Sequence, residues 1–369
     1  MNRNDDFSRL ELRLGNCRVN YRYYRSRLEA STGLLVLVKA NAYGHGAVEF
    51  AAMMQSCGAD YLAVALPVEG IELRKAGITL PILVLTAGVD FPGEMIDCRL
   101  EPGIPNLYTL RAFCEMLESR GIRNYPVHIK LDTGMHRLGF MESEIGELLE
   151  FLKGRECLRV ASVYSHLAAA EDPEQDDFTL AQIAAFQANA DRITESLGYK
   201  PMYHILNSAG IERFPQYQFD MVRLGIGIYG IGASARTPLL PVASFKVKVL
   251  QVKTLSPEDG TVGYSRKGVI LKPGTEIATI PAGYADGIDR HLGCGRARFS
   301  VNGRRVPTIG NICMDMCMLD VTGAGVKAGD TVTVFGDDPS VCELAEILGT
   351  IPYEVLSSIP RRIERVVIR

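Results

Sequence analysis

An eightfold alternation of apolar and amphipathic segments between Leu34 and Gly230 most constrains the fold of this chain. Short runs rich in branched aliphatic residues are typical of buried parallel strands. The expected strands are Leu34–Val38, Tyr61–Leu66, Pro81–Thr86, Arg99–Gly103, Val127–Asp132, Arg159–His166, Tyr203–Asn207 and Phe219–Leu224. The expected helices include Ala47–Cys57, Val68–Ala76, Leu107–Arg120, Glu142–Lys153 and Asp177–Leu197. Eight strands with such connections predict an α/β fold, a (β/α)8 barrel of the TIM type.

A doubly wound open sheet is the alternative for this part of the chain. Such a sheet normally uses fewer strands, and no GxGxxG motif opens the first βα unit here. After about Gly230 the pattern changes to short strands separated by turn residues, and Asn302-Gly303 is a typical hairpin turn. The strands expected there are Val247–Leu255, Val262–Ile270, Thr275–Pro281, Ala297–Val301, Val306–Thr308, Thr331–Phe335 and Glu364–Ile368, with a helix at Val341–Leu348. We therefore expect a barrel domain in residues 1–235 and a mostly β C-terminal domain in residues 236–369.

Composition excludes several classes of function. The 369 residues carry a formal net charge of -3, so no basic field attracts nucleic acid. No apolar run is long enough to span a membrane, and the polar start MNRNDDFSRL has no secretory core, so we expect a cytoplasmic protein. The nine cysteines lack the spacing of metal ligands, which predicts reduced thiols and no metal site.

The stretch LLVLVKANAYGHG, residues 34–46, ends a buried strand with a lysine. Burial at the mouth of an apolar core would lower the pKa of Lys39 and make its neutral amine a nucleophile or a base. A strand-end lysine can also extend its amine to water without any chemical role. Spacing alone leaves both interpretations open.

Other chemically active residues fall where barrel enzymes place their active sites, at the carboxyl ends of strands. A rim rich in Lys, Arg, His and Tyr predicts an anionic ligand, and glycine near the last strands lets backbone N–H groups approach a phosphate. Each residue alone has a structural explanation, such as a helix cap for Ser208 or a core position for His166. The residues at this rim are Lys39, Tyr43, Lys130, Asp132, Arg137, His166, Asn207, Ser208, Arg223, Gly225 and Ile226.

Seven motifs in order resemble those of the alanine racemase family. They are VKANAYGHG, KLDTGMHRLGF, VRLGIGIYG, VGYSRK, GYADG, GNICMDM and IPYEVL, and the resemblance runs from about Leu34 to Val367. The resemblance implies a barrel followed by a β-domain, and pyridoxal 5'-phosphate (PLP) as the cofactor.

The resemblance also assigns roles to residues of the barrel. Lys39 matches the lysine that binds PLP covalently, and Arg223 matches the arginine facing the pyridine nitrogen, held in place by His166. Arg137 matches the arginine near the phenolic oxygen of the cofactor and the substrate carboxylate. Lys130 matches a lysine that many members carry as a carbamate, and the sequence leaves that modification open. The phosphate cup is matched by Tyr43, Ser208, Gly225, Ile226 and Tyr353.

Racemisation removes a proton from one face of the α-carbon and returns one on the other, so two opposed bases are needed. The resemblance gives Lys39 and Tyr264 these two roles. The resemblance also implies that the backbone N–H of Met314, which precedes Asp315, binds the substrate carboxylate. It implies that Tyr284 and Tyr353 narrow the entrance to the active site. In this family the β-domain of one subunit completes the site of the other, so the resemblance implies a homodimer with shared active sites.

The expected function is the interconversion of L-alanine and D-alanine, which supplies D-alanine for peptidoglycan. One alternative is a racemase of broader specificity that also accepts serine, although Tyr353 should crowd larger side chains. Another is a PLP-dependent decarboxylase of basic amino acids, whose C-terminal domain supplies a cysteine, and Cys313 lies in a comparable region. A non-catalytic PLP-binding barrel is a third alternative, against which the β-domain with Tyr264 argues.

Overall fold

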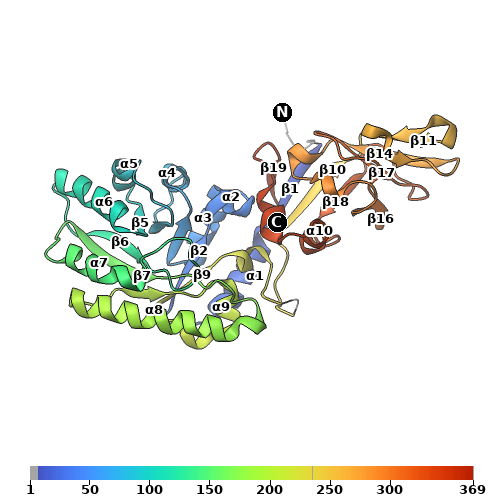
Figure 1. Cartoon of the computed structure of the whole chain (residues 1–369). Coiled ribbons are helices and arrows are strands. Elements are labelled where there is room, and N and C mark those ends of the chain that lie inside the picture. The colour runs from blue at the N-terminus through green and yellow to red at the C-terminus, as the bar shows by residue number, and fades with distance from the viewer. Residues whose placement is uncertain (1–6, 235, 369) are drawn as a thin grey trace. The chain divides into compact units, whose positions relative to one another are not determined.

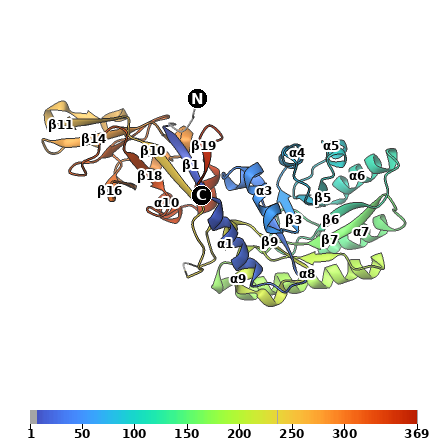
Figure 2. The same cartoon turned by 180° about the vertical axis from the view of Figure 1, so that it is seen from behind.

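The computed structural model describes residues 7–234 and 236–368, which form two compact units. One unit consists of residues 18–42 and 47–239, and we call it the barrel unit. The other combines the described part of residues 1–17 with residues 43–46 and 240–369, and we call it the β unit. Figures 1 and 2 show the elements of both units from opposite sides.

The barrel unit contains an eight-stranded sheet in which every paired strand is parallel. The strand order is β8-β7-β6-β5-β4-β3-β2-β9. The two end strands are joined by backbone bonds between the adjoining segments, such as Arg223 N–H to the Leu206 carbonyl at 3.0 Å, so the sheet is a nearly closed barrel. The strands are β2 Gly33–Leu37, β3 Tyr61–Val64, β4 Ile82–Val84, β5 Glu101–Ile104, β6 Tyr125–Lys130, β7 Leu158–Tyr164, β8 Met202–His204 and β9 Met221–Leu224. All eight barrel strands expected from the sequence are confirmed.

Helices lie between the strands and cover the barrel, as Figure 1 shows for α6, α7 and α8. Helix α6 begins where the Asn106 side chain accepts the N–H of Thr109 at 2.9 Å, and it buries Leu110, Phe113 and Leu117 along one face. The helical elements are α1 Leu14–Arg25, α2 Lys39–Tyr43, α3 Ala47–Cys57, α4 Pro67–Lys75, α5 Pro92–Asp97, α6 Leu107–Ser119, α7 Ile145–Leu152, α8 Asp176–Leu197 and α9 Ser208–Arg213.

The β unit contains a six-stranded sheet, a three-stranded sheet and a short hairpin. The six-stranded sheet has the order β16-β15-β18-β10-β1-β19, with β1 Ser8–Arg13, β10 Ala243–Lys248, β15 Arg298–Val301, β16 Arg304–Pro307, β18 Thr331–Phe335 and β19 Glu364–Ile368. The three-stranded sheet has the order β11-β14-β17, with β11 Gln251–Leu255, β14 Thr275–Ile280 and β17 Cys317–Asp320. The remaining elements are β12 Thr261–Val262, β13 Gly268–Val269, α10 Val341–Leu348 and α11 Pro352–Ser357.

The sequence-based picture of the β unit needs three corrections. Strand β1 pairs with β10 and β19, so the described residues before Arg18 belong to the β unit rather than to a barrel of residues 1–235. The expected strand Val247–Leu255 is divided between β10 and β11, which lie in different sheets. The expected strand Val262–Ile270 is two short strands around a 3-10 turn, Tyr264–Arg266, where Ser265 has a φ of 57° that a strand cannot contain.

The predicted hairpin at Asn302-Gly303 is confirmed between β15 and β16, where φ is positive at both residues, 49° and 73°. Within residues 7–234 and 236–368, no helix is long and apolar enough to cross a membrane. The same residues contain no cluster of His, Cys, Asp or Glu side chains that could hold a metal ion.

Candidate active site

Lys39 follows β2 and begins a strained turn. The next four residues, 40–43, have φ values of 51°, 55°, 52° and 53°, a left-handed conformation that costs L-residues about 1–2 kcal/mol each. Two side chains hold this turn: Glu69 Oε1 accepts the Ala40 N–H at 2.6 Å, and Asn41 Oδ1 accepts the Ala47 N–H at 3.0 Å. Backbone strain that the surrounding structure maintains is concentrated at functional sites.

Four cationic side chains act on one another at the carboxyl ends of the strands, and we call Lys39, Lys130, Arg137 and Arg223 the cation cluster. Burial, followed by the positive charge of Arg137, lowers the pKa of Lys39. Burial, followed by the charges of Arg137 and Arg223, lowers the pKa of Lys130 to about 8. These four members of the predicted rim therefore lie close together, and their excess positive charge favours an anionic ligand.

Arg223 is buried in β9 and surrounded by acceptors. Its Nη1 donates to His204 Nδ1 at 2.8 Å and to the His204 carbonyl at 3.0 Å. Its Nη2 donates to the Ser165 and Ile205 carbonyls at 2.5 and 2.9 Å and lies 3.2 Å from His166 Nδ1. Within the described chain the Nε–H has no partner, so it stays available to a bound ligand. Burial lowers the pKa of Arg223 to about 10, which leaves the guanidinium charged at neutral pH.

The Ser208 hydroxyl, which the sequence assigns to a phosphate cup, binds two backbone N–H groups. This oxygen accepts the N–H of Gly225 at 2.9 Å and the N–H of Gly227 at 3.3 Å, which ties the start of α9 to the segment after β9. Ser208 is not the cap of α9, because Asn207 Oδ1 accepts the Gly210 N–H at 2.9 Å and fills that role. Ile226 begins a 3-10 turn, Ile226–Tyr229, and is buried. Ser208 is thereby free of a capping role and fixes backbone N–H groups near the last strand.

The remaining predicted residues lie in the β unit. Tyr264 is 72% exposed and Met314 is 54% exposed, while Tyr284 is 45% exposed. The backbone at Tyr264 is held by Asn311 Nδ2, which donates to the Tyr264 carbonyl at 3.0 Å. The rings of Tyr43 and Tyr353 belong to this unit too, with their centroids 5.8 Å apart. Asp315 forms an ion pair with Arg362 at 2.8 Å, so it serves to fix its own loop.

Sequence reasoning missed several residues behind the rim. Glu69, at the start of α4, accepts the Ala40 N–H with one oxygen and the Ala65 and Leu66 N–H groups with the other, at 2.7 and 2.9 Å. His128, Ser162 and His204 are fully buried inside the barrel. The signal that could have found these three was a polar residue inside an otherwise apolar strand.

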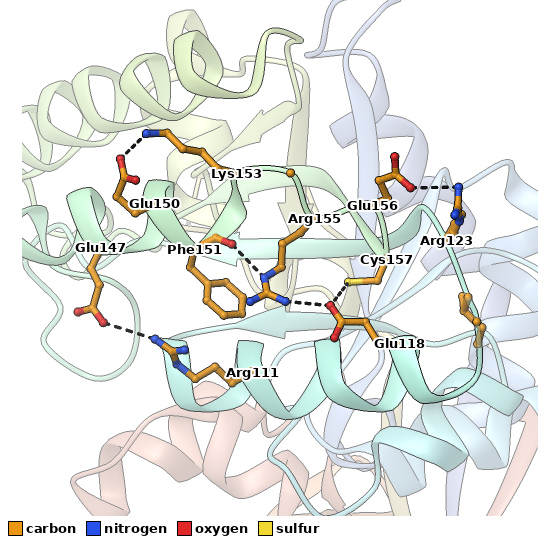
Figure 3. A pocket seen from close by; sticks show the side chains of 13 residues that line it. Arg111, Glu118, Arg123, Glu147, Glu150, Phe151, Lys153, Arg155, Glu156 and Cys157 are labelled. Atoms are coloured by element: carbon orange, nitrogen blue, oxygen red, sulfur yellow. Dashed lines mark hydrogen bonds and ion pairs between the residues drawn. The ribbon is translucent and has the colours of Figure 1, made fainter.

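A hollow of about 740 Å³ lies at the other end of the barrel, before the strands β6 and β7 begin. Figure 3 shows that its charged side chains pair with each other, for example Arg155 with Glu118 at 2.8 Å and Arg123 with Glu156 at 3.0 Å. Arg155 also stacks on Phe151, with its guanidinium carbon 4.1 Å from the ring centroid. A surface whose charges are already neutralised is a poor candidate for an ionic substrate.

The donors at the rim fit PLP. A desolvated lysine can attack an aldehyde, the cation cluster matches the anionic charge of the cofactor, and the unpartnered Arg223 Nε–H can meet a ring nitrogen. The backbone N–H groups around Ser208 suit a phosphate near the last strand. The fold and the site together define a PLP-dependent barrel enzyme.

Comparison with known proteins narrows this class. Residues 12–233 match the sequence profile of the alanine racemase N-terminal domain, and residues 242–367 match that of the C-terminal domain. Alanine racemase 2 of Bacillus subtilis is 37% identical, over 98% of this chain and 94% of its own. The solved alanine racemase of Clostridium difficile 630 has a TM-score of 0.92 and 33% identity, covering 98% and 96% of the two chains. The solved alanine racemase of Bartonella henselae, with covalently bound pyridoxal phosphate, has a TM-score of 0.88 and 28% identity, covering 98% and 100%.

The chain belongs to the alanine racemase family, and its cofactor is PLP. It is accordingly an isomerase, as the motifs had indicated. The similarity extends over both domains and joins them to racemases, which sets the decarboxylase alternative aside.

Proposed function

We propose that this chain is an alanine racemase that interconverts L-alanine and D-alanine with two bases, Lys39 and Tyr264. The observation that carries the proposal is the desolvated Lys39 within the cation cluster, in a chain similar to racemases over 98% of its length. PLP, when bound, withdraws electrons from the α-carbon of the amino acid and makes its hydrogen acidic. The chain's own residues bind the anionic groups and move the proton.

Lys39 acts on one face of the α-carbon. Its lowered pKa raises the fraction of neutral amine near neutral pH, and only the neutral amine can accept a proton. Arg137 and the backbone N–H of Met314 orient the substrate carboxylate. Arg223 and His166 support the ring of the cofactor, while Tyr43, Ser208, Gly225, Ile226 and Tyr353 enclose its phosphate.

Tyr264 acts on the opposite face. It needs nearby cations to accept a proton near neutrality, because the ordinary pKa of a tyrosine is about 10. The cation cluster of the barrel provides such charges. Protonation from this face yields the other enantiomer.

We place Tyr264 in the active site of a partner subunit, within a two-fold homodimer. The β unit exposes large apolar side chains at Tyr264 and in segments that pair or bond with its segment, and these side chains support an interface with a second copy of this chain. Large exposed apolar side chains gathered in one region mark interaction sites. These side chains are Tyr264, Val269, Leu271, Tyr284, Met314 and Met316.

D-alanine is needed for peptidoglycan, and we propose that the enzyme supplies it in the cytoplasm. Tyr353 limits the pocket to small side chains, which favours alanine over serine.

The test is exchange of the α-hydrogen of L-alanine in D2O, followed by separation of the enantiomers. The expected result is incorporation of deuterium together with formation of D-alanine, lost in Lys39→Ala and retained in the exposed control Lys153→Ala. Release of CO2 from lysine or ornithine, or no exchange with any amino acid, would contradict the proposed function.

A further inference from the structure

A chain of polar side chains crosses the apolar interior of the barrel, with one member on each of the five strands from β5 to β9. We call Glu101, His128, Ser162, His204 and Arg223 the inner chain. Its links measure 2.8 Å from Arg223 Nη1 to His204 Nδ1, 2.9 Å from His204 Nε2 to Ser162 Oγ, 2.6 Å from Ser162 Oγ to His128 Nδ1 and 2.7 Å from His128 Nε2 to Glu101 Oε2. Each distance is that of a hydrogen bond.

The arginine end fixes the direction of the first two bonds. A guanidinium only donates, so the Nδ1 atom of His204 must be an acceptor without a proton. Burial, followed by the charge of Arg223, lowers the pKa of His204 well below its usual value, which keeps the ring neutral. The single ring proton of His204 therefore lies on Nε2 and is donated to the Ser162 oxygen.

The carboxylate of Glu101 fixes the direction of the other two hydrogen bonds, which also donate from the Arg223 side towards Glu101. A carboxylate only accepts, so His128 Nε2 carries a proton and donates it to Glu101. The Ser162 hydroxyl accepts from His204 and donates its own hydrogen to His128 Nδ1. A doubly protonated His128 would leave this buried hydroxyl hydrogen without an acceptor in the described chain.

The inner chain offsets part of the free-energy cost of burying the charge of Arg223. Arg223 is buried, and among the described residues no carboxylate bonds it directly. An uncompensated buried charge is costly. Aligned hydrogen bonds polarise one another in a low-dielectric interior, so a carboxylate at the far end favours the donation that starts at the guanidinium.

We propose that Glu101 is a positioning residue for Arg223, acting across the barrel through His128, Ser162 and His204. The alignment holds the Arg223 Nη1 atom on His204 and so orients the Nε–H that remains for a ligand. The kinetic part of the test rests on the proposed function, whereas the spectroscopic part does not.

The spectroscopic test is 15N NMR of the histidine-labelled holoenzyme, which distinguishes the two neutral tautomers. His128 and His204 are expected as Nε2–H tautomers, because the arginine and the carboxylate enforce them. Ser162→Ala should release the fixed tautomer of His128, and Ser162→Thr, which keeps the hydroxyl, should restore it. A proton on Nδ1 of His204 in the unaltered protein would overturn the proposal.

The kinetic test is a double-mutant cycle on kcat/KM for racemisation. Glu101→Gln keeps an acceptor and removes the charge, so it should lower kcat/KM by roughly three- to thirtyfold. It should have no further effect in the Ser162→Ala background, where the chain is cut. Glu156→Gln, which alters an exposed carboxylate paired with Arg123, should leave kcat/KM unchanged.

Equal losses for Glu101→Gln in the two backgrounds would overturn the proposal, because Glu101 would then act by another route. If Ser162→Ala does not fold, His128→Phe, which has no ring nitrogen, cuts the chain one residue further along and replaces it in the kinetic test, while the tautomer of His204 remains the spectroscopic readout. If the protein shows the expected tautomers but does not racemise alanine, the proposed function is refuted, whereas the proposed alignment of hydrogen bonds in the inner chain still holds.

Discussion

The α-carbon of Gly227 faces the phenolic ring of Tyr24 so closely that a Cβ atom would lie 2.1 Å from the tyrosine oxygen. Tyr24 is fully buried and donates to Glu212 at 2.5 Å, so the ring has little freedom to move away. The same glycine donates its N–H to Ser208. Packing of the first helix thereby fixes the backbone of the proposed phosphate cup.

The first prediction follows from this contact. Gly227→Ala should lower the free energy of unfolding by about 1–3 kcal/mol, as overpacking of a rigid core does, and should weaken PLP binding. Denaturant unfolding and PLP titration measure the two effects. Gly146→Ala is the matched control, because its Cβ meets nothing within 4 Å in helix α7, and it should stabilise by about 0.5–1 kcal/mol. Equal free energies of unfolding and equal PLP binding in Gly227→Ala and Gly146→Ala would contradict the predicted clash between residue 227 and Tyr24.

The second prediction concerns Glu69. Glu69→Ala removes the acceptor for three backbone N–H groups, one of which belongs to the strained turn after Lys39. The free energy of unfolding should fall by about 1–3 kcal/mol, and PLP should dissociate more readily because the turn is released. Glu49→Ala, at an exposed position of α3, should stay within about 0.5 kcal/mol of the unaltered protein. Unchanged PLP retention in Glu69→Ala would contradict the prediction, because the turn after Lys39 would then keep its conformation without Glu69.

The third prediction concerns Lys130, whose pKa is lowered to about 8 by burial and by Arg137 and Arg223. Between about pH 8 and pH 10.5 the unfolded chain holds more protons at this lysine than the folded chain does, so its destabilising contribution is full below pH 8 and fades as pH rises. The neutral amine also reacts with CO2, and the resulting carbamate would attract Arg137 instead of repelling it.

Bound CO2 should therefore appear as a carbamate carbon in 13C NMR under labelled CO2. The signal should vanish in Lys130→Ala and persist in Lys153→Ala, an exposed control. A carbamate signal that survives in Lys130→Ala would assign the modification elsewhere.

The fourth prediction concerns substrate size. Tyr353 lies beside the ring of Tyr43, and its removal opens space at the proposed pocket. Tyr353→Ala should raise the ratio of kcat/KM for L-serine to that for L-alanine, by an amount equivalent to ~1–3 kcal/mol. Tyr108→Ala, in α6 and 70% exposed, should leave the ratio unchanged. An unchanged or lower ratio of kcat/KM for L-serine to that for L-alanine in Tyr353→Ala would refute the steric wall.

The barrel and its rim could be predicted from the sequence because strand ends are local features. Lys39 follows its strand, Lys130 ends its strand and Arg223 is the last residue but one of its strand, and parallel strands bring such ends together. The pairing of β1 with β10 and β19 depends on segments far apart in the chain, and no local pattern indicates it. The sequence predicts a strand at Tyr264 because serine and arginine do not indicate a positive φ, although Ser265 and Arg266 both adopt one.

The inner chain could not be predicted for a different reason. His128, Ser162 and His204 are visible as polar residues in apolar strands, but their bonds depend on the register of three neighbouring strands. A shift of one residue would turn each side chain to the other face.

The most direct measurement mixes Lys39→Ala subunits with Tyr264→Phe subunits and assays conversion of L-alanine to D-alanine. Each variant alone lacks one base at every site and should be nearly inactive. In a mixed dimer, one site combines Lys39 of one subunit with Tyr264 of the other and is intact. Random exchange makes about half of the dimers mixed, with one working site of two, so activity should return to about a quarter of that of the unaltered enzyme. Verified mixed dimers without recovered activity would contradict the shared two-base site.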